Sequence, residues 1–211
     1  MTIEVPAKGF IDKIEEWDTR VFLSLYNSKF SNRSKKFAKV YSFFGNWYFW
    51  MIVWLGIGIY GYITKDYDLF ILFTGGFDQA FALYLIIRYK LISRNRPFIK
   101  LEKHGVKQHD DLIAENKSFP SGHVTFFIYF GTLFAFYFNN WYILILFVLL
   151  GAMMAYTRLV LGVHFPMDVI FGFVFAFLFA LLYLGFTWIY WDAFYRWLGD
   201  FFWFINPQNW F

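Results

Sequence analysis

Three polar segments of this sequence carry residues that could do chemistry, and the first is "PSGH" at residues 120–123. A proline followed by a small hydroxyl residue and a glycine predicts a helix N-terminus, whose backbone N–H groups and dipole favour an anion. Gly122 would let a phosphate approach the backbone, and Ser121 would cap the helix or donate to a phosphate oxygen. His123 would then lie beside the bound anion. A plain capped helix with a surface histidine is the alternative interpretation.

The second segment is "YTRLVLGVHFPMDVI" at residues 156–170. His164 and Asp168 are separated by one helical turn, so a helix would place them on one face. The carboxylate could accept a hydrogen bond from one imidazole nitrogen and leave the other free as a nucleophile or base. Arg158 lies upstream, near the same membrane surface. A His–Asp pair that only stabilises a helix start, with Pro166 in its first turn, is the alternative.

The third segment is "RYKLISRNRPFIK" at residues 88–100, where several cations follow an apolar run that Arg96-Pro97 ends. Cations that match phosphate could lie here. Taken alone, the segment favours the alternative interpretation of snorkelling cations at a membrane boundary, which are very common.

The elements that must position these residues are membrane-spanning helices. The chain has 211 residues, of which 59% are hydrophobic, 27% aromatic and only 16% charged. Soluble domains are about 45–50% apolar, so these charges could not cover a soluble surface. The absence of cysteine excludes disulfides and thiolate metal sites. The net charge of +4 and its basic clusters suit anionic lipid headgroups better than nucleic acid.

Apolar runs predict the fold class: an all-α, polytopic transmembrane helix bundle of about five to six spans, with interfacial amphipathic helices at the termini. The dipeptide "NN" at 139–140 predicts a tight turn between two of these spans. The best count is five, at residues 43–64, 69–87, 124–138, 141–157 and 167–191.

We expect residues 1–211 to form a single domain in three parts. Residues 8–30 have apolar side chains at helical spacing and residues 31–42 are basic, which together predict an interfacial arm over 1–42. An ordinary solvated amphipathic helix is the alternative for this arm. The transmembrane core would follow over 43–191, and the segment 192–211, rich in Trp and Phe, predicts an aromatic belt at the interface.

This topology places the polar segments on one membrane face. The loop after the second span (88–123), the connection between the fourth and fifth spans (158–166) and the N-terminal arm would all lie there.

Together the three segments resemble the motifs of a known family, the type 2 phosphatidic acid phosphatases (PAP2), which are membrane relatives of the vanadium haloperoxidases. The family pattern is a lysine, six residues and Arg-Pro; then Pro-Ser-Gly-His; then Ser-Arg, five residues, a histidine, three residues and an aspartate. The resemblance covers roughly residues 43–190. The matching residues here are Arg96-Pro97, Pro120-Ser121-Gly122-His123, and Thr157-Arg158 followed at the family spacing by His164 and Asp168.

Two positions depart from the family pattern. Thr157 replaces the serine before Arg158 and keeps its hydroxyl. The family lysine would fall at Tyr89, which is flanked by Arg88 and Lys90. At about 100° per residue, either flanking residue points well away from the expected face. Lys90 could reach around through its flexible stem, Arg88 could substitute, or the helix could be distorted; we expect Lys90.

The resemblance implies a mechanism without a metal or other cofactor. His164 would attack phosphorus to form a phosphohistidine, Asp168 would hold the imidazole, and His123 would protonate the departing lipid oxygen and then activate water. Fixed donors around the phosphate would stabilise the charge that spreads over its oxygens. The residues implied to hold the phosphate are Lys90, Arg96, Ser121, Gly122 and Arg158.

Other polar residues predict less. The segment 103–116 holds His104, His109 and several carboxylates, so a metal site is conceivable, but a solvated loop that covers the site is favoured. Asp78 lies within the second span without an obvious partner and could be structural or lie in a wet pocket.

The leading hypothesis is a phosphatase for a membrane lipid phosphate: undecaprenyl diphosphate, phosphatidylglycerol phosphate, phosphatidic acid or lipid A. A lipid phosphotransferase that uses the same phosphohistidine is the second hypothesis. A transporter or lipid-binding scaffold without turnover is the third.

For the location, we expect a bacterial inner membrane. The family places its site on the extracytoplasmic face, whereas the lysines and arginines on the site's side would make that side cytoplasmic by the positive-inside rule. We follow the family.

Overall fold

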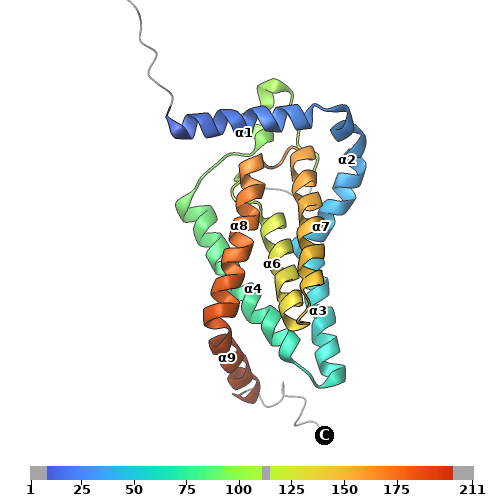
Figure 1. Cartoon of the computed structure of the whole chain (residues 1–211), viewed down its shortest axis with the longest axis vertical. Helices are drawn as coiled ribbons and strands as arrows, with labels where there is room; N and C mark the ends of the chain where they lie inside the picture. Colours follow the sequence, from blue (N-terminus) through green and yellow to red (C-terminus); the bar gives the residue numbers. More distant parts are fainter. Residues whose placement is uncertain (1–8, 111–114, 202–211) are drawn as a thin grey trace, which may run out of the picture.

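The computed structural model describes residues 9–110 and 115–201 of the chain. These residues form helices and connections, with one isolated β-bridge between Asn95 and Lys117 (Figure 1). The all-α prediction is therefore confirmed. The helices are α1 (Phe10–Tyr26), α2 (Lys29–Ser42), α3 (Trp47–Thr64), α4 (Asp68–Ile86), α5 (Pro97–Lys100), α6 (Gly122–Tyr137), α7 (Trp141–Val160), α8 (Pro166–Leu182) and α9 (Trp188–Phe201), with 3₁₀ turns at Phe43–Gly45 and Glu102–His104 and π-helical turns at Ile87–Leu91 and Tyr183–Thr187.

The membrane-spanning helices lie where the apolar runs predict them. Within the described residues, four helical segments are long and apolar enough to cross a membrane: Trp47–Thr64, Asp68–Lys90, Trp141–Val160 and Pro166–Phe201. The fifth predicted span is α6, an apolar helix of 16 residues. At about 1.5 Å per residue α6 covers about 24 Å, which is less than a hydrocarbon core of about 30 Å.

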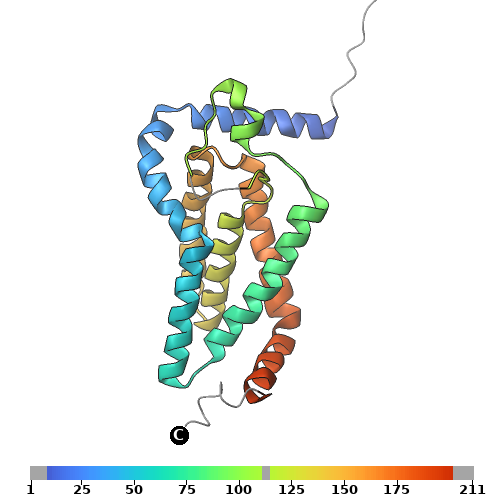
Figure 2. The ribbon, with the colours of Figure 1, turned by 180° about the vertical axis from the view of Figure 1, so that it is seen from behind.

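Helix α6 lies at the centre of the bundle, and most of its side chains are buried there. It packs against α4, α7 and α8, which surround it in Figures 1 and 2. Ile128, Tyr129 and Leu133 of α6 are completely buried, and the Tyr129 hydroxyl donates to the Gly76 carbonyl on α4 at 2.9 Å. As predicted, the turn at residues 139–140 leads directly into α7, where the Asn140 side-chain oxygen accepts the Tyr142 N–H at 2.9 Å.

Glycines let α6 and α7 approach closely. A Cβ atom on Gly131 would lie 2.2 Å from the ring of Phe147, and one on Gly151 would lie 2.1 Å from Ile128. Small residues at such contacts are how helices pack within a bilayer, where little hydrophobic driving force acts between them.

The N-terminal arm differs from the prediction of one amphipathic helix over residues 8–30. The chain breaks at Asn27, and α2 starts anew because the Ser28 hydroxyl oxygen accepts the Ser31 N–H at 3.0 Å. Helix α1 crosses the end of the bundle, whereas α2 bends down its side into α3 (Figures 1 and 2). The buried residues of α1 recur every four positions, so one stripe of the helix faces the bundle: Asp18, Phe22 and Tyr26. Residues 1–8 of the predicted arm lie outside the described residues.

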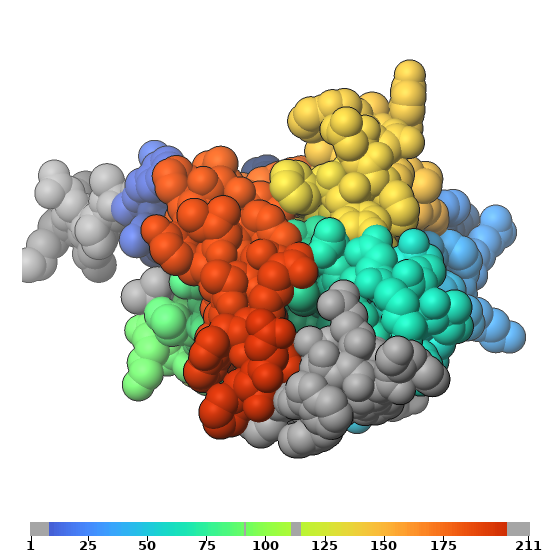
Figure 3. Space-filling model, turned by 90° about the horizontal axis from the view of Figure 1, so that it is seen from below, coloured from blue at the N-terminus to red at the C-terminus, as the bar shows by residue number. Residues whose placement is uncertain are grey.

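Up to residue 201, the C-terminal segment continues the last span as a helix. Helix α9 continues α8 after the π-helical turn and packs against α4, and Figure 3 shows the two side by side from below. Trp191 donates to Gln79 at 2.7 Å, and the Tyr195 hydroxyl donates to Asp78, the carboxylate for which no partner was expected. Residues 202–211 of the predicted interfacial segment lie outside the described residues.

All three polar segments of the sequence lie at the end of the bundle that α1 crosses. The N-termini of α6 and α8 and the C-terminus of α7 lie at that end, and the C-terminal end of α4 lies to one side of them (Figures 1 and 2). The sequence prediction of a common face agrees with this arrangement.

The close α6–α7 contact predicts that Gly131→Ala destabilises the protein. The added methyl group has to displace Phe147, which lowers the free energy of unfolding by about 1–3 kcal/mol, measured as a drop in unfolding temperature in detergent. Gly56→Ala on α3 is the matched control, because a Cβ atom there meets nothing within 4 Å. Equal unfolding temperatures for both variants would contradict this packing argument.

Candidate active site

The "PSGH" turn forms the start of α6, as predicted, and is held by its neighbours. Ser121 is the N-cap residue, but its hydroxyl makes no capping hydrogen bond. Its backbone N–H donates to the Asp168 carbonyl at 3.0 Å, which ties α6 to α8. A Cβ atom on Gly122 would lie 2.7 Å from the Tyr84 hydroxyl, so only glycine fits here without a shift. The Ser121 hydroxyl therefore remains available to a ligand.

Two loop segments align the third and first motifs. The Arg96 N–H donates to the Asn116 carbonyl at 3.0 Å, and the Ser118 N–H donates to the Arg94 carbonyl at 2.8 Å. This short ladder fixes Arg96 relative to the "PSGH" turn that begins two residues after Ser118.

Arg88, and not Lys90, is the cation that α4 brings to this ladder. Arg88 is 3% exposed, and its guanidinium donates to Tyr84 at 2.7 Å, to the Pro120 carbonyl at 3.1 Å and to Glu115 at 2.6 Å and 2.9 Å. Lys90 is exposed, so the structure does not support its predicted place in the phosphate site.

Arg88 takes the place predicted for Lys90 because residues Ile87–Leu91 form a π-helical turn. Such a turn holds more residues than an α-helical turn and changes the face on which each side chain lies. The distortion was one of the alternatives that the sequence left open. Each guanidinium nitrogen of Arg88 already donates to a protein acceptor, so Arg88 clamps the loop that leads into "PSGH".

Arg158 presents one open edge of its guanidinium. Its Nη1 donates to Asp110 at 2.8 Å and to the Ser42 hydroxyl. Its Nε and Nη2 are buried and have no hydrogen-bond partner among the described residues. Two parallel N–H donors on one edge match the spacing of two phosphate oxygens.

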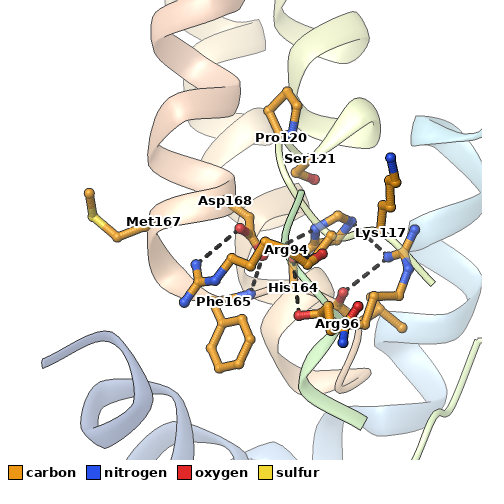
Figure 4. A network of polar contacts seen from close by, with 12 residues as sticks. Arg94, Arg96, Lys117, Pro120, Ser121, His164, Phe165, Met167 and Asp168 are labelled. Atoms are coloured by element: carbon orange, nitrogen blue, oxygen red, sulfur yellow. Dashed lines mark hydrogen bonds and ion pairs between the residues drawn. The ribbon is translucent and has the colours of Figure 1, made fainter. Parts of the chain in front are cut away.

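His164 lies in the turn between α7 and α8 and contacts a second arginine. Arg96 Nη1 lies 3.3 Å from His164 Nε2 and donates to the Val163 carbonyl at 3.0 Å. Because a guanidinium can only donate, Nε2 must accept, which leaves the imidazole proton on Nδ1. Nδ1 lies 3.6 Å from Asp168 Oδ2 (Figure 4).

His164 and Asp168 are brought together by a turn and not by a shared helix face. Helix α8 begins only at Pro166, after His164, so the predicted helical relation is wrong although the predicted proximity is right. Asp168 Oδ2 accepts the Phe165 N–H at 2.7 Å, and Oδ1 accepts from Arg94 at 3.1 Å. The carboxylate thus caps its own helix and faces the imidazole.

His123 occupies the first turn of α6 and packs tightly against a 3₁₀ turn. A Cβ atom on Gly45 would lie 2.9 Å from the His123 Cβ, so the turn presses directly on this histidine. The Nε2 atom is buried without a hydrogen-bond partner in the described part of the chain. His123 is close enough to His164, Arg158 and Arg96 to interact with them electrostatically.

The local charges favour a neutral His164 beside cationic arginines. Burial and the charges of Arg96, Arg158 and Arg88 hold the pKa of His164 well below its ordinary value. Burial, together with the neighbouring arginine charges, lowers the pKa of Arg96 to about 10, so it remains charged at neutral pH.

Several donors of the site share one property: they are buried and lack a protein partner, which is uncommon unless a ligand supplies the acceptor. The atoms are Ser121 Oγ, His123 Nε2 and Arg158 Nε and Nη2. An oxyanion with several acceptors fits this set. The described residues contain no group of three or more His, Cys, Asp or Glu side chains placed to hold a metal ion.

Sequence reasoning missed three charged residues of this site. Asp110 and Glu115 belong to the loop predicted to be solvated, yet Asp110 is buried beside Arg158 and Glu115 pairs with Arg88. Arg94 was one unremarked cation of the third segment and contacts Asp168. Asp111 of the loop lies outside the described residues. No spacing in the sequence identifies these partners, because each pair comes from two distant segments.

Comparison with known proteins agrees with the motifs. Residues 71–193, more than half of the chain, match the PAP2 superfamily. No curated protein sequence matches the chain.

Two solved structures have a similar fold. One is LpxE of Aquifex aeolicus, with a TM-score of 0.60 and 20% identity, over 88% of this chain and 100% of that chain. The other is the first transmembrane PAP2 type phosphatidylglycerolphosphate phosphatase from Bacillus subtilis, with a TM-score of 0.62 and 17% identity, over 83% of this chain and 87% of that chain. The apolar helices, the motifs and the family match lead to one conclusion: this chain is an integral membrane protein that belongs to the PAP2 superfamily.

Proposed function

We propose that this protein is a lipid phosphatase. It would hydrolyse the phosphate monoester or diphosphate of a membrane lipid through a phosphohistidine at His164. The observation that carries the proposal is the placement of His164 between opposite charges. Asp168 faces Nδ1 at 3.6 Å, and Arg96 lies 3.3 Å from Nε2. In a neutral imidazole held in this way the Nε2 lone pair faces Arg96, and an anion that took over the Arg96 N–H would lie directly beside this lone pair.

The first step transfers the phosphoryl group to the protein. Nε2 of His164 forms a bond to phosphorus as the bond from phosphorus to the lipid oxygen breaks. The leaving oxygen takes a proton from His123, and the Asp168 carboxylate offsets the positive charge that develops on the imidazole.

The second step releases phosphate. His123, now neutral, takes a proton from water as the water oxygen bonds to phosphorus and the P–N bond breaks. In both steps the charge on the equatorial oxygens would be stabilised by Arg96, the open edge of Arg158, the Ser121 hydroxyl and the Gly122 N–H. Fixed donors of this kind are among the largest contributions available to phosphoryl transfer.

The substrate we propose is a membrane lipid phosphate, because the site lies at one end of an apolar bundle whose helices can cross a bilayer. The two proteins of similar fold include a phosphatidylglycerolphosphate phosphatase. Phosphatidylglycerol phosphate, undecaprenyl diphosphate, phosphatidic acid and lipid A are the candidates. We further propose a single domain in a bacterial inner membrane, with the site on the extracytoplasmic face that the family resemblance implies.

The direct test is phosphate release by the purified protein in detergent, with the four lipids compared side by side in the presence of EDTA. His164→Ala should lower the rate by at least about 1,000-fold, because removal of a nucleophile abolishes the covalent route. His104→Ala is the matched control, since His104 is an exposed histidine of the neighbouring loop.

Transfer of labelled phosphate to an added lipid alcohol would identify a phosphotransferase instead. No release or transfer by well-folded protein would rule out the proposal for these lipids.

The low pKa of His164 predicts how activity depends on pH. The reactive form is the neutral imidazole, and a lowered pKa keeps this form populated as the pH falls. The acid limb of kcat/KM, which reports the free enzyme, should therefore lie below pH 6.5. The lipid phosphate also ionises in this pH range, so its pKa is measured by ³¹P NMR and the kcat/KM profile is corrected for it first. An acid limb for His164 at or above pH 6.5 would contradict the burial argument.

The contrast between Arg88 and Lys90 predicts unequal effects of two neighbouring substitutions. Arg88→Ala removes charged hydrogen bonds to Glu115 and the Pro120 carbonyl, which hold the loop that leads into "PSGH". One such bond contributes about 1.5–3 kcal/mol, so we expect kcat/KM to fall on the order of 100-fold. Lys90→Ala should stay within about twofold of the parent, because the side chain is exposed. The reverse ranking would restore Lys90 as the phosphate ligand.

A further inference from the structure

A buried carboxylate on α1 makes contacts that the mechanism above does not use. Asp18 is completely buried. Its Oδ1 accepts the backbone N–H of Met167 at 2.8 Å, and its Oδ2 accepts from Arg94. An aspartate from the N-terminal helix thus binds the first turn of α8, beside Asp168.

Arg94 connects Asp18 to Asp168. Its Nη2 donates to Asp18, and its Nη1 donates to Asp168 Oδ1 at 3.1 Å. The guanidinium carbon also lies 4.0 Å from the centre of the Phe165 ring, over which the cation packs. Figure 4 shows Arg94 extended toward Asp168, with Phe165 below it.

These contacts close a ring that fixes the Asp168 carboxylate. One oxygen is held by Arg94 and the other by the Phe165 N–H, so the group cannot rotate without breaking a hydrogen bond. The oxygen that faces His164 Nδ1 therefore stays in place. Arg94 also separates two buried carboxylates, which would repel each other without the cation between them.

We infer that Asp18 and Arg94 are positioning residues that hold Asp168 in the orientation needed by His164, so that α1 is part of the catalytic apparatus. The inference rests on the proposed function, because it assigns these residues to the same phosphoryl transfer. Neither residue touches the reacting atoms.

The chain offers a matched control on the same helix. Glu15 of α1 pairs with Lys100 of α5 at 2.8 Å, but this pair is exposed and does not contact Asp168. Glu15→Gln breaks an ion pair between α1 and the same loop region. Asp18→Asn is nearly isosteric and keeps an oxygen that can accept the Met167 N–H, so it removes the charge and the hydrogen-bond acceptor that hold Arg94.

The experiment compares Asp18→Asn, Arg94→Gln, Arg94→Lys, Glu15→Gln and His164→Ala in detergent-purified full-length protein. One readout is kcat and KM for the best lipid substrate. The second is the Kd for orthovanadate, which resembles the five-coordinate phosphorus of the transition state and requires no choice of lipid.

We expect Asp18→Asn and Arg94→Gln to lower kcat by about 10- to 100-fold, the range typical of a small misplacement of a catalytic group. KM should change by less than about threefold, and vanadate affinity should fall in parallel with kcat. Arg94→Lys should recover part of both, because it restores the charge. Glu15→Gln should match the parent.

Other outcomes separate this inference from the proposed function. If His164→Ala abolishes turnover and vanadate binding while Asp18→Asn and Arg94→Gln retain parental kcat and affinity, the function stands and the positioning role is overturned. A loss of kcat with unchanged vanadate affinity also overturns it. If the parent protein neither turns over a lipid nor binds vanadate, the proposed function fails and the inference fails with it. Should Arg94→Gln not fold, Asp18→Asn and Arg94→Lys carry the same comparison.

Discussion

Positive charge buried at one end of an apolar bundle is the constraint that the surrounding structure satisfies. Three arginines carry this charge and are almost completely buried: Arg88 is 3% exposed, Arg96 4% and Arg158 0%. A buried ion without compensation costs several kcal/mol, so each guanidinium needs acceptors close at hand. The long connection between α5 and α6 supplies them, because Glu115 pairs with Arg88 and Asp110 pairs with Arg158. This connection is therefore a structural part of the site.

The protein neutralises some of these arginines more fully than others, and the arginines left without a carboxylate or with unpaired N–H groups favour the binding of an anion. Arg88 is saturated by protein acceptors and Arg94 lies between two carboxylates. Within residues 9–110 and 115–201, by contrast, the acceptors that meet Arg96 are neutral, and Arg158 keeps an open edge. The positive charge that remains thus faces His164 and the start of α6. A phosphate group would complete the neutralisation that the protein leaves unfinished.

Spacing along the sequence predicted which motif residues lie close together, but it did not predict how residues from distant segments pair. Ser121, Gly122, His123, His164 and Asp168 lie in continuous motifs, so sequence alone brought them to one place. A π-helical turn decides which of Arg88 and Lys90 points toward the site, and no local residue preference predicts such a turn. The Asp18–Arg94–Asp168 contacts join three segments far apart in the chain, and their pairing is decided by how α1 packs across the bundle. The spans were predictable because their apolar runs are long, whereas the continuation of α8 into α9 was hidden by aromatic residues that suit an interface equally well.

For the proposed reaction, the two ends of the span Asp68–Lys90 would set the depth of the site relative to the bilayer. Asp68, paired with Arg196, and Arg88, which clamps the "PSGH" loop, are separated along this helix by about 30 Å at about 1.5 Å per residue, the thickness of a hydrocarbon core. The reacting phosphorus would then lie at headgroup level while the acyl or prenyl chains stay among the lipids. Encounter between protein and substrate becomes a two-dimensional search, and the quantity that governs its frequency is the mole fraction of substrate in the surface and not its concentration in bulk water.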